Sequence, residues 1–483
     1  MTDIPTLNSQ QAGEPKITII CSTLDMASQN IKNHLLSMRK WVHTGCTCSV
    51  CPDVCSIYEF ENFRIVEVDN YHLYQDGIDE KLINCGLPTK LIIFASKHKS
   101  KDGRKLLTAH FTGNVRDADF GGRPQEFAKA APHALRSLLK TMQVLAKNTD
   151  YNVSMESTHH GPTHLHIPSV YVEIGSGETQ WNDSIPGAIV ANAIMSLDLE
   201  EVPVALGFGG GHYAPRQSKL LFETGVTFGH NFSNYQLQYL DKDLIKQAFD
   251  NSDADFVYFD RKSMPARERD RIGKIVEELG SEVLREGDIR EMDGIPWEFC
   301  KQVRQKANEF CPGGRTKLTD GIKSEVKMLD LPCRGCRCPK VRASRIDREL
   351  LQEAEIVDKE RVRAFLDSYN IAYLERSNGT VAHVIFSIDD ECARFVVQKL
   401  TNECIKILKG HYEIKYIPDE NVLYLIDKKF NPELARELGV PPGPMFGELT
   451  GGKAVTVNGK SITPEMVYQS NRKKIILTNK INF

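Results

Sequence analysis

The sequence contains no apolar run that approaches the roughly 18 residues needed to cross a bilayer. Its first 15 residues are polar and lack the charged-then-apolar pattern of a secretion signal. We therefore expect a cytoplasmic protein with no membrane partner. The net charge is only −3, so the chain is not a generic polyanion binder, and any contact with nucleic acid must come from local basic patches. The sequence also lacks internal repeats and long low-complexity segments.

The composition is that of a folded protein, with 41% hydrophobic and 26% charged residues, and the length suggests two or three domains. From about residue 16 to residue 300, strand-like apolar runs alternate with helical patterns. This alternation predicts an α/β domain with a mixed, largely parallel sheet and helices on both faces. Around it we expect a flexible tail at 1–15, a basic, cysteine-containing connector at 301–345 and a smaller α+β extension of unknown role at 346–483.

The densest group of potential ligands is histidine-rich. Four of the 14 histidines fall within eight residues: His159, His160, His164 and His166. Imidazole is the commonest transition-metal ligand, and Gly161-Pro162 predicts a bend that can aim several rings at one point. Glu156 and Glu173 flank the bend as candidate ligands, orienting groups or general base. Neither His-Glu-x-x-His nor the His-x-His-x-Asp-His motif is present, so the spacing leaves the reaction class open.

Further candidates stand at the ends of other predicted strands. After the strand at 202–207, the amides of Gly209, Gly210 and Gly211 can line an anion or oxyanion pocket beside His212 and Arg216. A tight structural turn is the alternative for this glycine run. His98, His110 and His230 also lie on or after predicted strands. Such a distribution is what one convergent site produces, although hydrogen-bonded core histidines would give the same pattern.

Cysteine forms two clusters among the 13 present, which is a high number for a reducing compartment. The first, in a loop at 44–56, holds Cys46, Cys48, Cys51 and Cys55. The second holds Cys333, Cys336 and Cys338. Their spacing suits a closed zinc site or an iron–sulfur cluster, formed separately or jointly, and simple surface thiols are the alternative.

Seven sequence blocks carry a resemblance to a known family. They are Ala95–Arg104, His110–Asn114, Thr158–Thr163, Val172–Ser176, Gly207–Arg216, Phe228–His230 and Lys262–Met264. In order and context they resemble the archaeal- and plant-type D-aminoacyl-tRNA deacylases over about residues 15 to 290. The resemblance implies a zinc-associated cytoplasmic hydrolase that cleaves the ester between a D-amino acid and the 3′ end of tRNA. It also implies a fold similar to nucleoside phosphorylases and peptidyl-tRNA hydrolases, with the catalytic domain at 16–300.

On this interpretation each candidate receives a predicted role. The predicted catalytic residues are His159, His160, His212 and Glu173. The predicted zinc ligands are His98, His110, His159, His160 and His230, with a second zinc at the cysteine clusters. Gly209, Gly210 and Gly211 would bind the oxyanion or a phosphate, and phosphate contacts would come from Arg216, Lys97 and Arg104. We expect a monomer that binds the acceptor end of D-aminoacyl-tRNA and has no obligate protein partner. The alternatives are a metal-dependent hydrolase of another ester or nucleoside, and a non-catalytic zinc-containing tRNA-binding protein.

Overall fold

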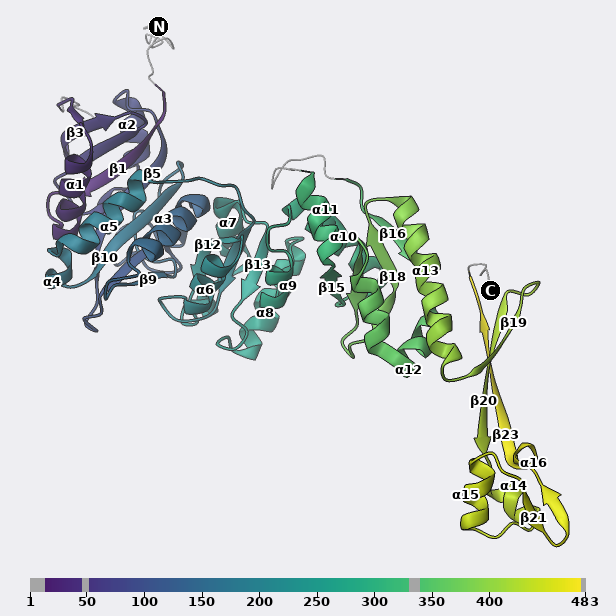
Figure 1. Ribbon diagram of the computed structural model, residues 1–483. Helices are drawn as coiled ribbons and strands as arrows, with labels where there is room; N and C mark the ends of the chain where they lie inside the picture. Colours follow the sequence, from purple (N-terminus) through teal and green to yellow (C-terminus); the bar gives the residue numbers. More distant parts are fainter. Residues whose placement is uncertain (1–13, 46–51, 330–338, 479–483) are drawn as a thin grey trace. The chain divides into compact units, whose positions relative to one another are not determined.

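The computed structural model describes residues 14–45, 52–329 and 339–478. The chain divides into two compact units, residues 1–294 and residues 295–483 (Figure 1). The division falls a few residues before the expected end of the main domain, and most of the expected tail lies outside the described residues. None of the helices in the described part of the chain combines the length and apolarity that crossing a bilayer requires.

The first unit is built on an eight-stranded sheet in the order β2-β3-β4-β1-β5-β10-β6-β9. The strands are β1 (Lys16–Ser22), β2 (Val42–His43), β3 (Val54–Phe60), β4 (Phe63–Val68), β5 (Thr89–Lys99), β6 (Leu106–His110), β9 (Asn152–Met155) and β10 (Ser169–Ser176). The pairs β4–β1, β1–β5, β5–β10 and β6–β9 are parallel, and the remaining neighbours are antiparallel. The predicted α/β class with a mixed, largely parallel sheet is confirmed.

Burial explains why the central strands read as continuous apolar runs. Every residue of β4 and β10 is buried, as is typical of strands covered on both faces. Three helices pack side by side along the sheet: α1 (Met26–Met38), α3 (Pro132–Leu145) and α5 (Ser184–Met195) (Figure 1). Helix α2 (Ile78–Asn84) packs instead into an apolar cluster with Ile20, Phe94 and Tyr171.

A second, fully parallel sheet completes this unit in the order β12-β11-β13-β14. Its strands are β11 (Val204–Phe208), β12 (Thr227–Phe232), β13 (Phe256–Phe259) and β14 (Val283–Leu284). The accompanying helices are α6 (Pro215–Glu223), α7 (Lys242–Ser252), α8 (Ala266–Glu278) and α9 (Glu286–Glu291), whereas the short α4 (Glu178–Trp181) packs against β10 and α1 of the large sheet. The sequence predicts alternating strands and helices here, but not the short β14 and not the separation into two sheets, because alternation along a chain does not specify which strands pair.

The second unit begins with α10 (Trp297–Phe310) and α11 (Asp320–Met328). Its main sheet has the order β15-β17-β18-β16 and carries α12 (Arg348–Asp367) and α13 (Asp390–Lys409), which pack against each other. The strands are β15 (Arg315–Leu318), β16 (Arg342–Arg345), β17 (Ala372–Glu375) and β18 (Val381–Ser387). The segment 301–345, which we expected to be a connector, supplies both edge strands of this sheet, β15 and β16. The sequence does not reveal this, because the strands with which they pair, β17 and β18, come later in the chain.

The remaining elements of the second unit form smaller sheets. A three-stranded sheet has the order β19-β20-β23, and a hairpin pairs β21 with β22. Their bounds are β19 (Glu413–Ile417), β20 (Val422–Phe430), β21 (Val455–Val457), β22 (Lys460–Ile462) and β23 (Tyr468–Ile476). Three short helices accompany them: α14 (Pro432–Glu437), α15 (Pro444–Thr450) and α16 (Pro464–Val467).

Candidate functional site

Three neighbouring strands bring their polar side chains to one face of the large sheet. Tyr171 of β10 pairs in register with His110 of β6, and Gly175 of β10 pairs with His98 of β5. Alternate residues of a strand point to the same face, so Glu173 lies on the face that carries both histidines. The register of the sheet therefore gathers two histidines and one carboxylate that the sequence separates.

The histidine bend crosses this same face immediately after β9. Its beginning is fixed by two backbone bonds, from the amide of Ser157 to the His212 carbonyl (2.7 Å) and from Thr158 to the Asn231 carbonyl (2.8 Å). The close approach of the bend to residues 121–122 requires Gly161, because a Cβ at this position would collide with their backbone. These constraints direct His159 and His160 towards the histidines of the sheet.

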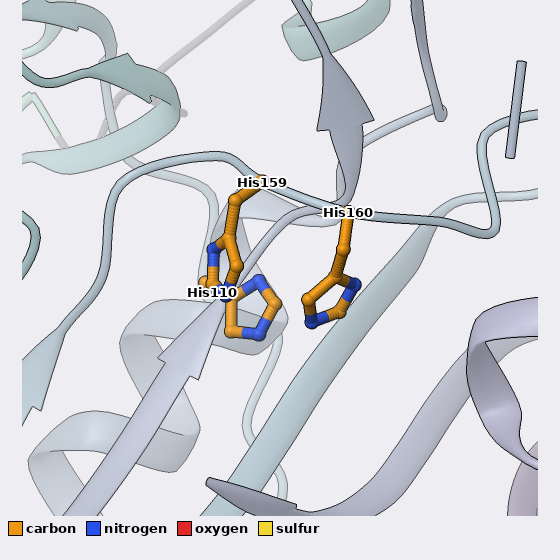
Figure 2. Close-up of side chains that lie close together, drawn as sticks. All are labelled: His110, His159 and His160. Atoms are coloured by element: carbon orange, nitrogen blue, oxygen red, sulfur yellow. The ribbon is translucent and has the colours of Figure 1, made fainter. Parts of the chain in front are cut away.

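His110, His159 and His160 form a compact trio (Figure 2), with one ring nitrogen of each within 4.8 Å of the others. In each ring, Nδ1 is bonded to a backbone carbonyl: His110 to Phe111 at 3.1 Å, His159 to Ser157 at 2.8 Å and His160 to Gly161 at 2.7 Å. A carbonyl oxygen only accepts, so each neutral ring carries its proton on Nδ1 and keeps a lone pair on Nε2. Three such nitrogens directed at one point are the donor set of a catalytic zinc site.

The protonation of the trio also fits a divalent cation. Burial lowers the pKa of His160 to about 3 and that of His159 well below its ordinary value, and both rings are therefore neutral, as metal ligation requires. Burial also acts to lower the pKa of His110, but the Glu173 carboxylate outweighs it and raises this pKa. Nε2 of His110 is buried without a hydrogen-bond partner in the described residues. A metal ion bound to Nε2 of His110 would replace the proton that the negative charge of Glu173 stabilises on this nitrogen.

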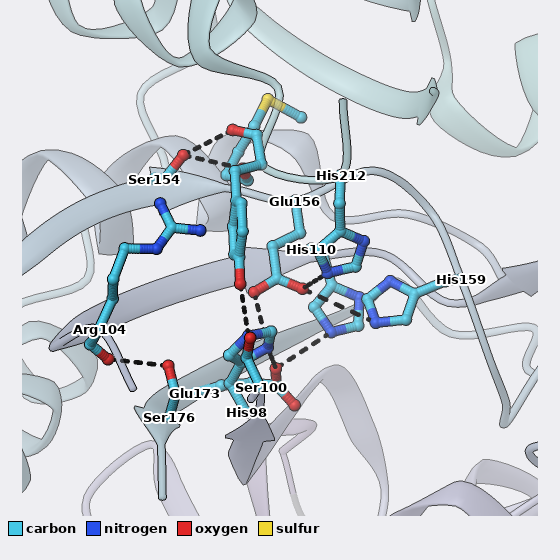
Figure 3. A network of polar contacts seen from close by, with 12 residues as sticks. His98, Ser100, Arg104, His110, Ser154, Glu156, His159, Glu173, Ser176 and His212 are labelled. Atoms are coloured by element: carbon cyan, nitrogen blue, oxygen red, sulfur yellow. Dashed lines mark hydrogen bonds and ion pairs between the residues drawn. The ribbon is translucent and has the colours of Figure 1, made fainter. Parts of the chain in front are cut away.

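A second group centres on Glu156, which is only 1% exposed (Figure 3). Its carboxylate lies 2.9 Å from Nε2 of His212 and 3.0 Å from Nδ1 of His98. Burial acts to raise the pKa of Glu156, yet the contacts with His212 and His98 hold it well below the ordinary value. Donor atoms of these three residues also lie within 4.8 Å, but here they contact one another, as expected of an ionic network.

Glu173 joins the two groups (Figure 3). Its Oε2 lies 3.6 Å from Nδ1 of His98 and 3.7 Å from Nε2 of His110. Burial opposes ionisation of Glu173, but the two histidines lower its pKa to about 2. Conversely, burial acts to lower the pKa of His98, and the two carboxylates outweigh it and raise this pKa to about 11. At neutral pH the site therefore holds two buried carboxylates around a cationic His98.

A cavity of about 750 Å³ opens onto this network. Its floor includes His98, His159, His160, Glu173 and His212, so both histidine groups are accessible to a ligand. Exposed aromatic rings also line the cavity: Tyr71 (39% exposed), Phe120 (66%), Tyr235 (57%) and Tyr239 (39%). The charged lining is mixed, with Lys97, Lys99 and Arg116 beside Asp25, Asp117 and Asp119, and Arg116 pairs with Asp117 at 2.8 Å. The cavity thus combines histidines with exposed aromatic rings and charges of both signs.

Most of the histidines predicted as site residues meet in this cavity, together with Glu173 and Lys97. Two further contributors have no functional signal in the sequence. The hydroxyl of Tyr213 lies 3.0 Å from Nε2 of His98, and Asp25 accepts a bond from the Lys97 amide at 3.1 Å. Asp25 also caps the start of α1, because its other oxygen accepts a hydrogen bond from the amide of Ser28.

His230 lies apart from the trio, although it was predicted as a metal ligand. It is fully buried, with Nδ1 3.0 Å from the Thr158 hydroxyl and Nε2 2.9 Å from the Ala128 carbonyl. Both ring nitrogens are thus engaged by protein atoms. His230 has the contacts of a core histidine that supports the start of the bend, so we do not include it in the ligand set.

The glycine run after β11 is held by internal hydrogen bonds. The amide of Gly209 donates to the Phe232 carbonyl at 2.7 Å, and that of Gly210 donates to the Ser263 hydroxyl at 2.7 Å. These two amides are consequently not free to bind an oxyanion or a phosphate. Both glycines have positive φ angles, as a tight structural turn requires. Such a role for Gly211 stays a prediction.

Two of the three predicted phosphate contacts lie outside the cavity lining. Arg216 lies 3.3 Å from Asp260 and 3.9 Å from Glu286. Arg104 pairs with Asp102 at 2.6 Å and lies over the ring of Tyr213. Carboxylates therefore already neutralise both guanidinium groups, and among the three only Lys97 lines the cavity.

The other candidate metal ligands lie elsewhere. His164 lies 3.3 Å from Glu126, and the exposed His166 lies 3.4 Å from Glu80, so neither belongs to the trio. Of the seven clustered cysteines, Cys46, Cys48, Cys51, Cys333, Cys336 and Cys338 lie outside the described residues. Cys55 is described and exposed. The second metal site stays a prediction.

Comparison with known proteins agrees with this geometry. The family model for D-aminoacyl-tRNA deacylase matches residues 85–284. A D-aminoacyl-tRNA deacylase of Methanococcoides burtonii is 46% identical over 98% of this chain and 99% of its own length. The chain belongs to the D-aminoacyl-tRNA deacylase family. The resemblance carried by the seven sequence blocks is thereby confirmed.

Other members of the deacylase family differ in length. The Methanoculleus marisnigri deacylase is 33% identical over 95% of this chain and 98% of its own length. The Methanosarcina acetivorans deacylase is 51% identical but covers 61% of this chain and 99% of its own length. A crystal structure of a conserved protein of unknown function is 34% identical, with a TM-score of 0.53, and covers 57% of this chain and 96% of its own. Proteins named D-aminoacyl-tRNA deacylase therefore match either 98% or only 61% of this chain.

Proposed function

We propose that this deacylase hydrolyses the ester bond of D-aminoacyl-tRNA in the cytoplasm, releasing the D-amino acid and tRNA. The observation that carries the proposal is the histidine trio in a chain of this family, with two of its members, His159 and His160, lining a cavity.

Zinc is the metal that we assign to His110, His159 and His160. Nitrogen donors lie about 2.0–2.1 Å from zinc, so nitrogens within 4.8 Å of one another reach a common ion after small side-chain rotations. When bound, zinc supplies Lewis acidity, which polarises an ester carbonyl and lowers the pKa of water. The Phe111 carbonyl orients the His110 ring by accepting a hydrogen bond from Nδ1, as carbonyls do for metal-ligating histidines.

Two other groups act on the ester in this proposal. His212 is the general base, because it lines the cavity and the buried Glu156 carboxylate orients its ring. His98 stays protonated because its pKa is about 11, and its positive charge at the cavity floor stabilises the oxyanion that forms as water attacks. In this proposal His98 stabilises the oxyanion, whereas the sequence suggested this role for the amides of Gly209, Gly210 and Gly211.

The rim of the cavity fits the single-stranded 3′ end of tRNA. Unpaired bases stack on aromatic rings, and Phe120, Tyr235 and Tyr239 offer exposed rings. Lys97 and Lys99 place positive charge near the ester, where a terminal phosphate group would lie. These features favour an aminoacyl-tRNA over a small ester or a nucleoside.

The direct test is incubation of the purified protein with D-Tyr-tRNA and with L-Tyr-tRNA. We expect selective hydrolysis of the D form, and equal hydrolysis of both or of neither would contradict the proposal. His160→Ala and His212→Ala should abolish turnover while circular dichroism stays unchanged. His166→Ala is the matched control, because this exposed histidine lies outside the cavity lining, and it should keep the wild-type rate.

A further inference from the structure

The charge of the chain is divided unequally between its two units. Residues 1–294 contain 30 lysines and arginines against 39 aspartates and glutamates, a net charge of −9. Residues 295–483 contain 31 against 25, a net charge of +6. Transfer RNA is a polyanion, whose long-range attraction depends on such charge. The unit that holds the histidine site therefore repels the proposed substrate on average, and the second unit attracts it.

Three cations of the second unit line a hollow of about 430 Å³ beside α12: Arg348, Lys359 and Arg376. Arg348 is the first residue of this helix, Lys359 lies further along it, and Arg376 follows β17. The lining also offers the amide groups of Gln352 and Asn378 and the hydroxyl of Thr380. Guanidinium, ammonium, amide and hydroxyl groups are the donors that bind phosphate oxygens in nucleic acids.

Among the described residues, none of these three cations forms an ion pair, although the Glu355 carboxylate acts on Lys359 and Arg376 at longer range. In the part of the chain that the structure describes, none of them lies within 4.0 Å of a carboxylate, whereas nearby Arg363 pairs with Glu375 at 2.9 Å. The hollow contains two carboxylates: Glu353 pairs with Lys473, and Glu355 accepts a bond from the Val381 amide at 2.9 Å. Positive charge therefore remains available to an anion.

Arg376 is also held in place before any ligand binds. Its Nη1 donates to the Val381 carbonyl at 2.6 Å, and its Nη2 lies 3.4 Å from Nδ1 of His383. Burial lowers the pKa of His383, and the charges of Arg376, Arg348 and Arg345 lower it further. The positive charges of Arg376, Arg348 and Arg345 thus keep the imidazole of His383 neutral. Because hydrogen bonds already hold the Arg376 side chain in place, it loses less conformational entropy when a phosphate binds.

We propose that this hollow binds the phosphate backbone of tRNA, with Arg348, Arg376 and Lys359 as its contacts. The inference rests on the proposed function, and it gives the second unit the role of supplying affinity while the first unit performs the chemistry. Binding through phosphates makes the contact independent of RNA sequence.

The test measures binding of uncharged tRNA to the full chain by fluorescence anisotropy at several salt concentrations. Each lost phosphate contact should reduce the slope of log Kd against log salt by about 1. Arg348→Gln and Arg376→Gln should each show this change, and the double variant should bind about tenfold more weakly at low salt. The matched control is Arg361→Gln, which removes an exposed arginine that is already paired with Glu403.

The possible outcomes separate this inference from the proposed function. Unchanged slopes in the double variant, or a wild-type chain that binds inorganic phosphate but not tRNA, would overturn the inference. If Arg376→Gln unfolds the chain, the exposed Arg348→Gln carries the test alone. Hydrolysis of a D-tyrosine methyl ester, which lacks RNA, should be equal in all variants. Failure of the wild type to hydrolyse D-aminoacyl-tRNA would contradict the proposed function but leave the binding result interpretable.

Discussion

Oε2 of Glu156 lies 2.9 Å from Nε2 of His212, and the carboxylate is almost completely withdrawn from solvent. A buried carboxylate against an imidazole orients the ring and stabilises the cation that forms when the ring accepts a proton. Glu156 is inaccessible to substrate, but through this contact it can act on His212, which lines the cavity. The first prediction tests this link.

Glu156→Gln keeps the size of the side chain but removes its charge. We expect kcat on D-Tyr-tRNA to fall by about 100-fold or more, with little change in KM, because an oriented general base contributes at least this factor. Steady-state kinetics measures both constants. Glu80→Gln is the control, because this exposed carboxylate contacts His166 outside the cavity lining. If the Glu156→Gln variant keeps the wild-type kcat, the Glu156–His212 pair has no role in catalysis.

Metal content should depend on the histidine trio. His110→Ala and His159→Ala each remove one of three Nε2 donors, so the purified variants should contain much less zinc than the wild type. Mass spectrometry of the metal in dialysed protein provides the measurement. The site assignment is wrong if either variant retains a full equivalent at the trio.

His230→Gln distinguishes a core histidine from a metal ligand. The wild-type side chain bonds both Thr158 and Ala128 in the interior, so we expect the free energy of unfolding to fall by about 1–3 kcal/mol while zinc content stays unchanged. Urea titration and metal analysis of the same preparation give the two values. Loss of zinc without loss of stability would restore the original ligand prediction.

The pH dependence of stability should report the same burial. Burial lowers the pKa of His230 to about 4, whereas an unfolded histidine titrates near 6.5. Between these values the unfolded state binds the additional proton, so this contribution to stability is present above about pH 6.5 and is lost as the pH falls towards 4. The loss should approach about 3 kcal/mol. His230→Gln should unfold in urea with a correspondingly flatter pH profile; an unchanged profile would exclude His230 as the source.

The aromatic rim should contribute to substrate affinity. Phe120→Ala and Tyr235→Ala each remove an exposed ring, and we expect KM for D-Tyr-tRNA to rise about tenfold, since base stacking contributes about 1–3 kcal/mol per base. Tyr74→Ala is the matched control, because Tyr74 is 55% exposed but does not line the cavity. An equal effect of all three substitutions on KM would show that the rim has no specific role.

Local sequence features determined a large part of this protein. The alternation of apolar strands and helical patterns specified the α/β class, since residue periodicity depends on neighbours along the chain. The sequence around Gly161-Pro162 specified a bend with two adjacent histidines, because proline and glycine restrict the backbone wherever they occur. The seven blocks were sufficient to indicate the family. The histidine bend and the deacylase family therefore needed no tertiary information.

Only the tertiary structure decided which of the histidines act together. His110 meets His159 because of the pairing between β6, β9 and β10, and strand register is set by long-range packing. His230 and the amides of Gly209 and Gly210 are removed from the candidate set by hydrogen bonds to distant segments. A ring nitrogen or an amide can serve a ligand only when the fold leaves it without another partner, and these partners come from residues far away in the sequence.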